Sequence, residues 1–238
     1  MLIRVATGLA VALVLPIAMS RAEPTTLLLT TQHWPPYHEL KNGTPHGIAI
    51  TALDCILDRM KQPRRIEFLP WRRAQDEVRA GRAHGFLLAS HSPERDRFAR
   101  LSAPIAPQTW AWYLPHGSTL SPTREEFKSS ARTSALAGSN MAQWLTDSGY
   151  KVGGFAATTD QLVLMLQRGR VDAVLANTLV FDYSVAQLQI PATQFRRAGE
   201  VRRPLGVYFS RRFLAENPTF LNRFNAEVAR CRAANGAT

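Results

Sequence analysis

The sequence is short of cysteine, of acidic residues and of long apolar runs, and each shortage excludes a class of protein. Its two cysteines, Cys55 and Cys231, do not have the spacing of a zinc site, and their even count is compatible with one disulfide. The separation of their Cα atoms decides between a disulfide and two free thiols, so both alternatives stay open here. We predict no metal site and no cofactor, because the clustered histidines His33, His38 and His46 match no usual ligand spacing.

The one long apolar run stands at the N-terminus, and it indicates export. Arg4 precedes the run at residues 5–19, and Ser20-Arg21-Ala22 supplies the small residues that a signal peptidase reads. We therefore predict a signal peptide over residues 1–22 and a soluble mature protein that is exported. The alternative is an uncleaved anchor, which is less favoured because no later segment is long and apolar enough for a membrane protein.

Acidic residues are outnumbered by basic ones, and the formal net charge of +11 falls to +9 when Arg4 and Arg21 are removed with the leader. A basic surface attracts nucleic acid, anionic lipid or anionic small molecules. The arginines are spread along the chain and form no basic run. Since an exported protein rarely meets nucleic acid, we expect no nucleic-acid partner. The roughly 216 residues after the leader are enough for two modest domains or one large one.

Residues 78–90 and 166–178 echo each other, because each stretch reads as a helix end, a glycine and a short apolar strand that finishes on small polar residues. A glycine just past the last helical residue ends a helix at little conformational cost, and the unbroken apolar run after it is typical of a strand buried on both faces. The duplication favours two similar α/β lobes. Open α/β sheets bind ligands at the carboxyl ends of their strands, so we expect a cleft between the lobes.

Apolar periodicity and turn residues place the remaining elements. We expect the other strands at residues 26–31, 66–69, 109–114, 133–137 and 204–210, and the other helices at residues 47–60, 72–80 and 219–234. Ser92-Pro93-Glu94 is typical of a helix start, with Ser92 as the N-cap residue. Ser139 and Thr158 are expected to cap helices in the second half.

Eight short motifs occur in the order found in one known family. They are Trp34-Pro35-Pro36-Tyr37, Gly47-Ile48-Ala49-Ile50, Pro70-Trp71, Gly81-Arg82-Ala83-His84-Gly85, Ser90-His91-Ser92-Pro93-Glu94-Arg95, Leu101-Ser102-Ala103-Pro104-Ile105, Gly138-Ser139-Asn140 and Gly169-Arg170-Val171-Asp172-Ala173. In this order the chain resembles the family 3 extracellular solute-binding proteins, the periplasmic receptors of polar amino acid ABC transporters. The resemblance runs over essentially the whole mature chain. It implies a type II periplasmic-binding-protein fold, an α/β fold in which two lobes are joined by two hinge strands.

The resemblance also implies how the chain is divided. Lobe 1 would comprise residues 23–114 and 202–238, and lobe 2 residues 115–201, with the crossings near residues 113–116 and 201–205. Lobes of this family close on the ligand by hinge motion. We expect a monomer whose partners are a small-molecule ligand and, by resemblance, a membrane ABC permease.

The same resemblance implies which residues bind the ligand in the first lobe. Arg95 corresponds to the carboxylate-binding arginine of the family, and its guanidinium fork can hold a carboxylate through two parallel hydrogen bonds. Ser90 and Ser92 match positions that offer backbone and hydroxyl donors to the ligand. Trp34 and Trp71 match the two side chains that sandwich it, and Tyr37 stands in the same loop as Trp34.

In the second lobe, Ser139 and Asn140 match a loop at a helix start, where free N–H groups favour an anion. One position departs from the family. Amino acid receptors carry an aspartate after the second repeated strand to pair with the ammonium of the ligand, and this chain has Asn177 there. Asp182 could substitute only if the strand end is shaped differently. A carboxylate, a peptide-like compound or another anion therefore fits better than a standard α-amino acid.

We predict a solute-binding protein that captures a small carboxylate-bearing ligand, with transport implied by the resemblance, and not an enzyme. No Ser-His-Asp order, nucleophile elbow or phosphate-binding loop is present. Two alternatives are kept. The periplasmic cyclohexadienyl dehydratases resemble these receptors but need a general acid in the cleft, and neither Glu94 nor Asp182 is obviously placed for it. A ligand-sensing or partner-binding module would act through a separate partner.

Overall fold

The computed structural model describes residues 25–234, and within it the two echoed stretches form matching units. The first is α2 (Trp71–Arg79) followed by β5 (Gly85–Ala89), and the second is α6 (Thr159–Gln167) followed by β9 (Ala173–Asn177). Gly81 and Gly169 follow the helices with φ of 74° and 64°, the left-handed conformation that glycine adopts freely. In both units the glycine and the residue after it donate to carbonyls of the last turn, so each helix ends in a Schellman motif.

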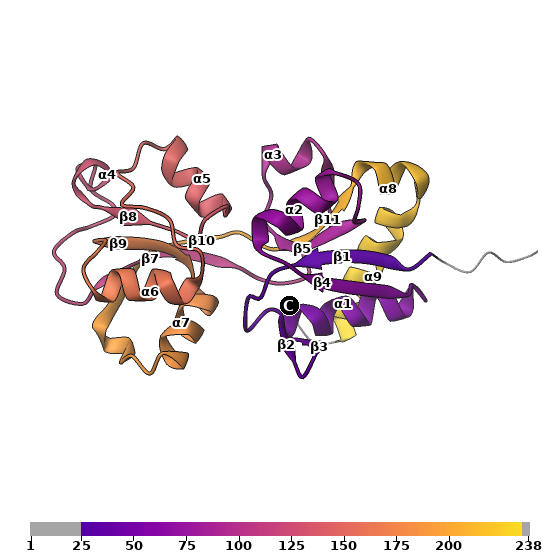
Figure 1. Cartoon of the computed structure of the whole chain (residues 1–238), viewed down its shortest axis with the longest axis horizontal. Coiled ribbons are helices and arrows are strands. Elements are labelled where there is room, and N and C mark those ends of the chain that lie inside the picture. The colour runs from indigo at the N-terminus through magenta and orange to yellow at the C-terminus, as the bar shows by residue number, and fades with distance from the viewer. Residues whose placement is uncertain (1–24, 235–238) are drawn as a thin grey trace, which may run out of the picture.

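The first lobe is built on a five-stranded sheet with the order β4-β1-β5-β11-β6 (Figure 1). Its strands are β1 (Leu27–Thr31), β4 (Arg64–Phe68), β5, β6 (Ala99–Leu101) and β11 (Gly206–Ser210). β1 pairs in parallel with β4 and β5, whereas β11 runs antiparallel to β5 and β6. Strands from both ends of the chain therefore meet in one sheet. The short strands β2 (Glu39–Lys41) and β3 (Thr44–His46) form a hairpin beside it.

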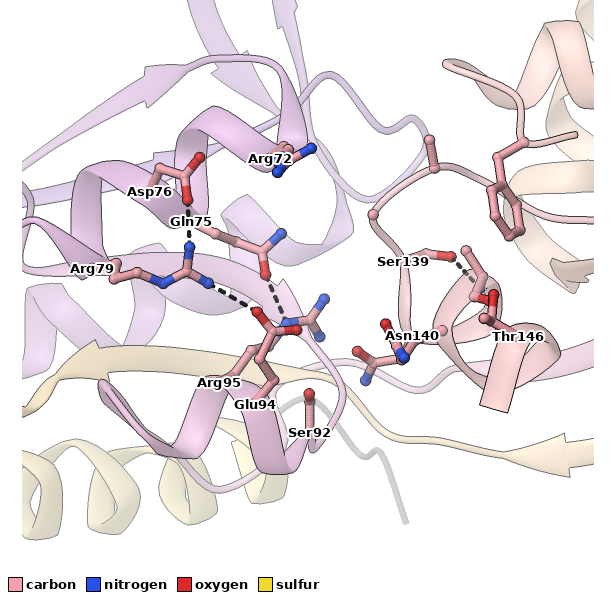
Figure 2. Close-up of a pocket in the computed structure, with 15 residues that line it drawn as sticks. Arg72, Gln75, Asp76, Arg79, Ser92, Glu94, Arg95, Ser139, Asn140 and Thr146 are labelled. Carbon is pink, nitrogen blue, oxygen red and sulfur yellow. Dashed lines mark hydrogen bonds and ion pairs between the residues drawn. The ribbon is translucent and has the colours of Figure 1, made fainter. Parts of the chain in front are cut away.

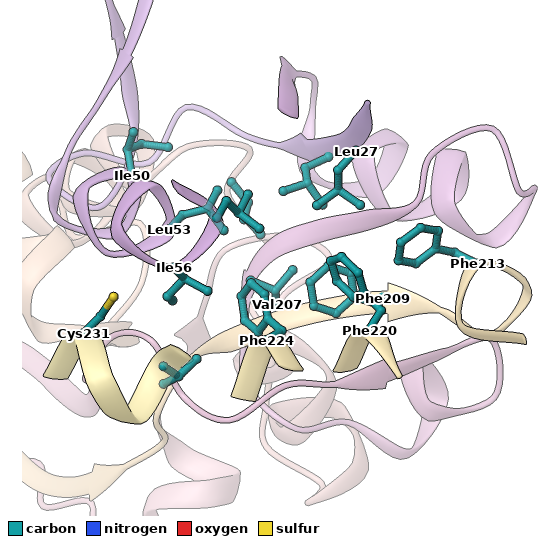
Figure 3. Packing of buried hydrophobic residues seen from close by; sticks show 14 residues of the cluster. Leu27, Ile50, Leu53, Ile56, Val207, Phe209, Phe213, Phe220, Phe224 and Cys231 are labelled. Atoms are coloured by element: carbon teal, nitrogen blue, oxygen red, sulfur yellow. The ribbon is translucent and has the colours of Figure 1, made fainter. Parts of the chain in front are cut away.

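Helices cover both faces of this sheet. α1 (Ile48–Arg59) and α9 (Phe220–Ala234) pack with the strands into one apolar cluster, and α2 packs on Phe86 and Tyr208 into another. α3 (Pro93–Asp96) and α8 (Arg211–Glu216) are short. Cys55 on α1 and Cys231 on α9 form a disulfide with a Cα–Cα distance of 6.2 Å. Cys231 belongs to the first cluster and lies at its edge (Figure 3). Of the two alternatives that the sequence left open, the structure shows the bond.

The second lobe is built on a four-stranded sheet with the order β10-β7-β9-β8. Its strands are β7 (Thr109–Pro115), β8 (Thr133–Ser134), β9 and β10 (Phe195–Arg202). The helices of this lobe are α4 (Phe127–Ser130), α5 (Asn140–Asp147), α6, α7 (Thr178–Gln187) and the 3-10 turn η1 (Ala192–Gln194). Apolar clusters on the two faces of the sheet bury Trp112 and Phe127 on one side and Phe181 on the other.

The sheet order corrects the position of the first crossing between the lobes. The sequence placed this crossing near residues 113–116, but β7 pairs with β10 and β9 and so belongs to the second sheet from Thr109 onward. The reason is that β10 supplies a long antiparallel partner for β7, and no strand was expected at 195–200. On sheet membership we assign the crossings to residues 102–108 and 203–205.

The predicted signal peptide at residues 1–22 lies outside the described residues. Among residues 25–234, no helix combines the length and the apolar character that a membrane crossing requires.

Candidate ligand site between the lobes

The lobes contact each other through residues that the sequence singled out. The side-chain amide of Asn140, at the start of α5, donates hydrogen bonds to Ser90 O (3.2 Å), Ser90 Oγ (2.8 Å) and His91 O (2.9 Å). Trp71 Nε1 donates to Gly138 O across the same interface, at 3.2 Å. Because β5 ends at Ala89 and α5 begins at Asn140, a strand end of one lobe faces a helix start of the other.

Two of the cavities at this interface are lined by Arg95; a further one, of about 440 Å³, lies between Ser92 on one lobe and Trp144 and Asp147 on the other. Of the two lined by Arg95, the smaller has a volume of about 30 Å³ and is lined by Gln32, Trp34, Trp71, Leu88, Ala89, Ser90, Arg95, Gln108, Trp110, Leu136, Ser139, Asn140, Met141 and Leu205. The larger, of about 410 Å³, opens between α2 and α3 on one side and α5 on the other (Figure 2). Both cavities are lined by Arg95, Ser139 and Asn140, so these residues stand between them.

Arg95 is a buried cation without an ionic partner. The residue is 5 % exposed, its Nε donates to Gln75 Oε1 at 2.8 Å, and its Nη1 donates to Ser90 O at 3.2 Å. No carboxylate of the described residues lies within ion-pair distance of it, and the Trp71 ring lies 5.3 Å from the guanidinium carbon. Burial lowers the pKa of Arg95 to about 10, so the side chain stays charged at neutral pH.

The carboxylates that line the larger cavity are already engaged. Asp76 and Glu94 both pair with Arg79, at 2.6 and 3.0 Å. In Figure 2 this group lies on the side of Arg95 away from α5, and the Arg95 guanidinium points from α3 toward Asn140. The part of the site between Arg95 and α5 is therefore cationic, and the part beyond Arg95 carries one arginine between two carboxylates.

The start of α5 adds to the positive character of the site. Ser139 is the N-cap residue, and its hydroxyl accepts a hydrogen bond from the backbone N–H of Ala142 at 3.1 Å. The partial positive charge of a helix N-terminus favours an anion, and this one faces Arg95 across the interface. An anion between the two would contact both lobes.

The remaining predicted residues divide into two groups. Trp34 and Trp71 line the smaller cavity, and Ser92 lines the larger one. The Ser92 side chain makes no capping bond to α3, although the sequence indicated one; its backbone N–H donates instead to Tyr208 Oη at 3.0 Å. Tyr37 and Asn177 line neither cavity.

Tyr37 and Asn177 are hydrogen-bonded to each other. The Asn177 amide donates to Tyr37 Oη at 3.3 Å, and Tyr37 Oη donates to Pro107 O at 2.6 Å. Asn177 Oδ1 accepts from the backbone N–H of Val180 at 3.2 Å, so Asn177 is the N-cap residue of α7. Both side chains are buried. The expectation that they face the ligand therefore finds no support in the geometry.

An Asn177→Asp variant tests this assignment. Aspartate also caps helices well, so we expect α7 to persist, while burial of a carboxylate without a cation lowers stability by about 1–3 kcal/mol. Because residue 177 lines neither cavity, the variant should gain no affinity for α-amino acids. Isothermal titration with alanine, glutamine and arginine measures this, and newly acquired binding of any of them would place residue 177 in the site.

Three residues of this site were not predicted from the sequence. Gln75 orients Arg95, and Gln108 and Trp110 line the smaller cavity. The available signal was chemical: Trp110 stands in a strand expected to be buried, and a buried indole N–H needs a hydrogen-bond partner.

Comparisons with solved structures identify the fold. A histidine kinase sensor domain with similarity to periplasmic binding proteins superposes with a TM-score of 0.79 and 17 % identity, over 90 % of this chain and 93 % of that one. An ancestral arginine-binding protein bound to arginine gives 0.72 and 20 %, over 89 % and 94 %. The arginine-, lysine-, histidine-binding protein of Geobacillus stearothermophilus gives 0.74 and 14 %, over 90 % and 92 %. No family model and no curated protein matches the sequence.

The chain therefore has the type II periplasmic-binding-protein fold, as the order of its eight motifs indicated. The structures it is similar to include arginine- and other amino acid-binding proteins, the substrate binding protein of an amino acid ABC transporter, and a histidine kinase sensor domain. At sequence identities of 14–20 % the structural similarity defines the fold alone, so the ligand is inferred from the residues of the site.

Proposed function

We propose that this protein is a periplasmic receptor that captures a small carboxylate-bearing molecule between its two lobes. The observation that carries the proposal is Arg95, a buried guanidinium that faces two interlobe cavities without an ionic partner among the described residues. A guanidinium has five N–H donors, and the two bonds to Gln75 and Ser90 leave three of them for a ligand. An uncompensated buried charge lowers stability, so its presence at a cleft favours a role in binding.

The ligand carries no free ammonium next to its carboxylate. The smaller cavity is lined by no acidic residue, and the two carboxylates of the larger one are held by Arg79. Asn177 stands where amino acid receptors place an aspartate, and it caps α7 instead. The site is thus suited to an anion and offers nothing of opposite charge to an α-ammonium beside Arg95.

Uptake through an ABC permease is the transport role that we propose, with the protein acting as a monomer. Several structures of similar fold are binding proteins of arginine or other amino acids, and one is a binding protein of an amino acid ABC transporter. Capture without chemistry suits the site better than catalysis. A dehydratase of this fold needs a general acid, and the carboxylates that line the two cavities next to Arg95, Asp76 and Glu94, are both ion-paired with Arg79.

Ligand sensing is the second candidate, favoured by the similarity in fold to a histidine kinase sensor domain. Both roles need a ligand and differ in the partner. Co-purification with a permease or with a receptor kinase from membranes distinguishes them. The Arg95→Met variant tests whether the association with that membrane protein depends on the bound ligand.

The experiment that tests the proposal is a thermal-shift screen of the mature protein against carboxylates, dicarboxylates, amino acids, short peptides, polyamines and prephenate. A ligand present at one hundred times its dissociation constant adds about 2.7 kcal/mol to the free energy of unfolding. We expect stabilisation by carboxylates and none by polyamines. Stabilisation by polyamines alone, or by none of the compounds, would refute the proposal.

Asn140 is expected to control how readily the lobes close. An Asn140→Ala variant loses the hydrogen bonds to Ser90 and His91, each with a net contribution of about 0.5–1.5 kcal/mol, and this shifts the ligand-free protein toward the open form. Small-angle scattering should report a larger radius of gyration. The matched control is Asn222→Ala on α9, an exposed asparagine in lobe 1. An unchanged radius in Asn140→Ala would mean that these bonds do not hold the lobes together in solution.

A further inference from the structure

The larger cavity is lined by a second arginine that the proposed function has not used. Arg72 borders this cavity together with Arg95, and the Arg72 side chain has no ion pair and no hydrogen bond within the described part of the chain. The third arginine of the lining, Arg79, is held by Asp76 and Glu94. Two cations of this cavity, one exposed and one buried, are therefore left without a carboxylate partner among residues 25–234.

The position of Arg72 follows from the face that α2 turns to the cavity. Four residues of this helix line the cavity, and their spacing of three and four positions puts them on one face: Arg72, Gln75, Asp76 and Arg79. Gln75 stands in the middle of this row and accepts from Arg95 Nε at 2.8 Å. Figure 2 shows Arg72 at the end of α2 that faces the second lobe and Arg79 at the other end. The arginine without a partner is thus the one nearer to the second lobe.

Asp76 is close enough in the sequence to neutralise Arg72 and does not do so. Residues four apart on a helix are neighbours, so a pair of Arg72 with Asp76 was available. Asp76 pairs instead with Arg79, at 2.6 Å, and Arg79 also binds Glu94 of α3 at 3.0 Å. Both carboxylates of the lining are therefore gathered at the Arg79 end of α2. The charge of Arg72 is left for the cavity.

The start of α2 adds backbone donors next to Arg72. The helix begins at Trp71, and no side chain caps it, so the N–H groups of its first turn have no side-chain partner. This end lies at the interface between the lobes, because Trp71 Nε1 donates to Gly138 O at 3.2 Å and Gly138 lines the cavity. The partial positive charge of a helix start favours an anion. Each of the two unpaired arginines therefore has a helix start near it, that of α2 for Arg72 and that of α5 for Arg95.

The spacing of the two arginines along α2 suits a short chain with an acid group at each end. Gln75, which binds Arg95, lies three residues after Arg72, and three residues of an α-helix rise about 4.5 Å. Two carboxylates joined by roughly two to four CH₂ groups span a comparable length. The volume of about 410 Å³ is within the range of small-molecule sites. A chain that extended from Arg95 toward Arg79 instead would meet two carboxylates.

We propose that the ligand is a dicarboxylate, with one carboxylate on Arg95 and the other on Arg72. The proposal rests on the proposed function, because it needs a carboxylate on Arg95. It goes beyond that function in assigning to Arg72 the discrimination between a dicarboxylate and a monocarboxylate of the same length.

The test uses pairs of probes with equal numbers of carbon atoms: succinate and butyrate, glutarate and pentanoate, adipate and hexanoate. Isothermal titration with the mature protein at neutral pH and constant ionic strength measures each affinity. We expect the dicarboxylate of at least one pair to bind about fivefold or more tightly than its monocarboxylate, because the second acid group gains a charged partner. Added salt should reduce this ratio, since Arg72 is exposed.

Two variants show whether the preference comes from Arg72. Arg72→Met removes the guanidinium and keeps the apolar stem, so it should lower the affinity for the dicarboxylate about fivefold or more, to that of the monocarboxylate. Its affinity for the monocarboxylate should change by less than about twofold. Arg73→Met is the matched control, because Arg73 is also exposed, pairs with Glu77 at 3.7 Å and does not line the cavity. It removes the same charge and should leave the ratio unchanged.

Several results would overturn the proposal. They are equal affinity within every pair, tighter binding of the monocarboxylates, a preference that survives in Arg72→Met, or an equal loss in Arg73→Met. The last result would mean that the net charge of the protein, and not the place of Arg72, attracts the dicarboxylate. If monocarboxylates bind as tightly as dicarboxylates and binding needs Arg95, the proposed function stands and this proposal fails. If no carboxylate binds at all, both fail.

Discussion

Replacing Arg95 by methionine is expected to abolish capture of carboxylates, with a loss of affinity of about 100-fold or more. The guanidinium would supply two charge-assisted hydrogen bonds in a buried site, each stronger than a neutral one, and a thioether supplies none. Arg95→Lys should retain a small part of the affinity, because one ammonium cannot bond Gln75, Ser90 and a carboxylate with the geometry of the fork. Isothermal titration of the three proteins with the best carboxylate of the screen measures the effect.

Stability distinguishes a binding role of Arg95 from a structural one. Without ligand, Arg95 is a buried charge with no ionic partner in the described chain, and replacing such a charge by an apolar side chain of similar volume is neutral or stabilising. The ligand-free Arg95→Met variant should therefore unfold at the same denaturant concentration as the wild type or at a higher one. Arg97→Met, two residues further on at an exposed position, is the control for both measurements. A loss of several kcal/mol in Arg95→Met with unchanged affinity would show that the arginine serves the fold.

Local rules predicted the parts of this protein that local interactions determine. The two helix–glycine–strand units were predicted because a glycine at Gly81 or Gly169 has one physical use there, the left-handed end of a helix. Ser139 and Thr158 were recognised as caps, and both side chains accept the expected backbone N–H. From these units followed the two lobes and the cleft between them, and the family resemblance placed Ser90 and Asn140 in that cleft, where they hydrogen-bond to each other.

Interactions between distant segments determined what the sequence did not predict. β10 carries charged side chains on half of its residues, and it becomes a strand because β7, some eighty residues earlier, offers it an antiparallel partner. Asn177 was assigned to the ligand by its place in a motif, but its amide oxygen serves the nearest unpaired N–H, that of Val180. Whether Gln108 Oε1 and Trp110 Nε1 find a hydrogen-bond partner depends on all the residues packed around them, so the apolar periodicity of the sequence cannot predict it.

Removing the disulfide is expected to have the largest effect on stability of any change away from the cleft. Cys55 and Cys231 are 176 residues apart, so their bond closes a loop that contains the whole second lobe. Closing so long a loop restricts the unfolded chain strongly, and the loss in a Cys55→Ala/Cys231→Ala variant is about 3–5 kcal/mol. For a chain of this length the melting temperature should fall by about 10 °C. Differential scanning calorimetry of the mature protein measures both quantities.

Reductant provides the matched control for this prediction. A thiol reductant should lower the melting temperature of the wild type to that of the double variant and leave the variant itself unchanged. Equal melting temperatures of wild type and variant, with no response to reductant, would mean that the bond does not contribute in solution. The affinity for a carboxylate at 25 °C should stay the same, because neither cysteine lines the interlobe cavities and the apolar cluster of α1, α9 and the sheet still holds lobe 1 together. The bond thus stabilises the lobe that carries Arg95 by joining the two ends of the chain that build its sheet, and it takes no part in recognition.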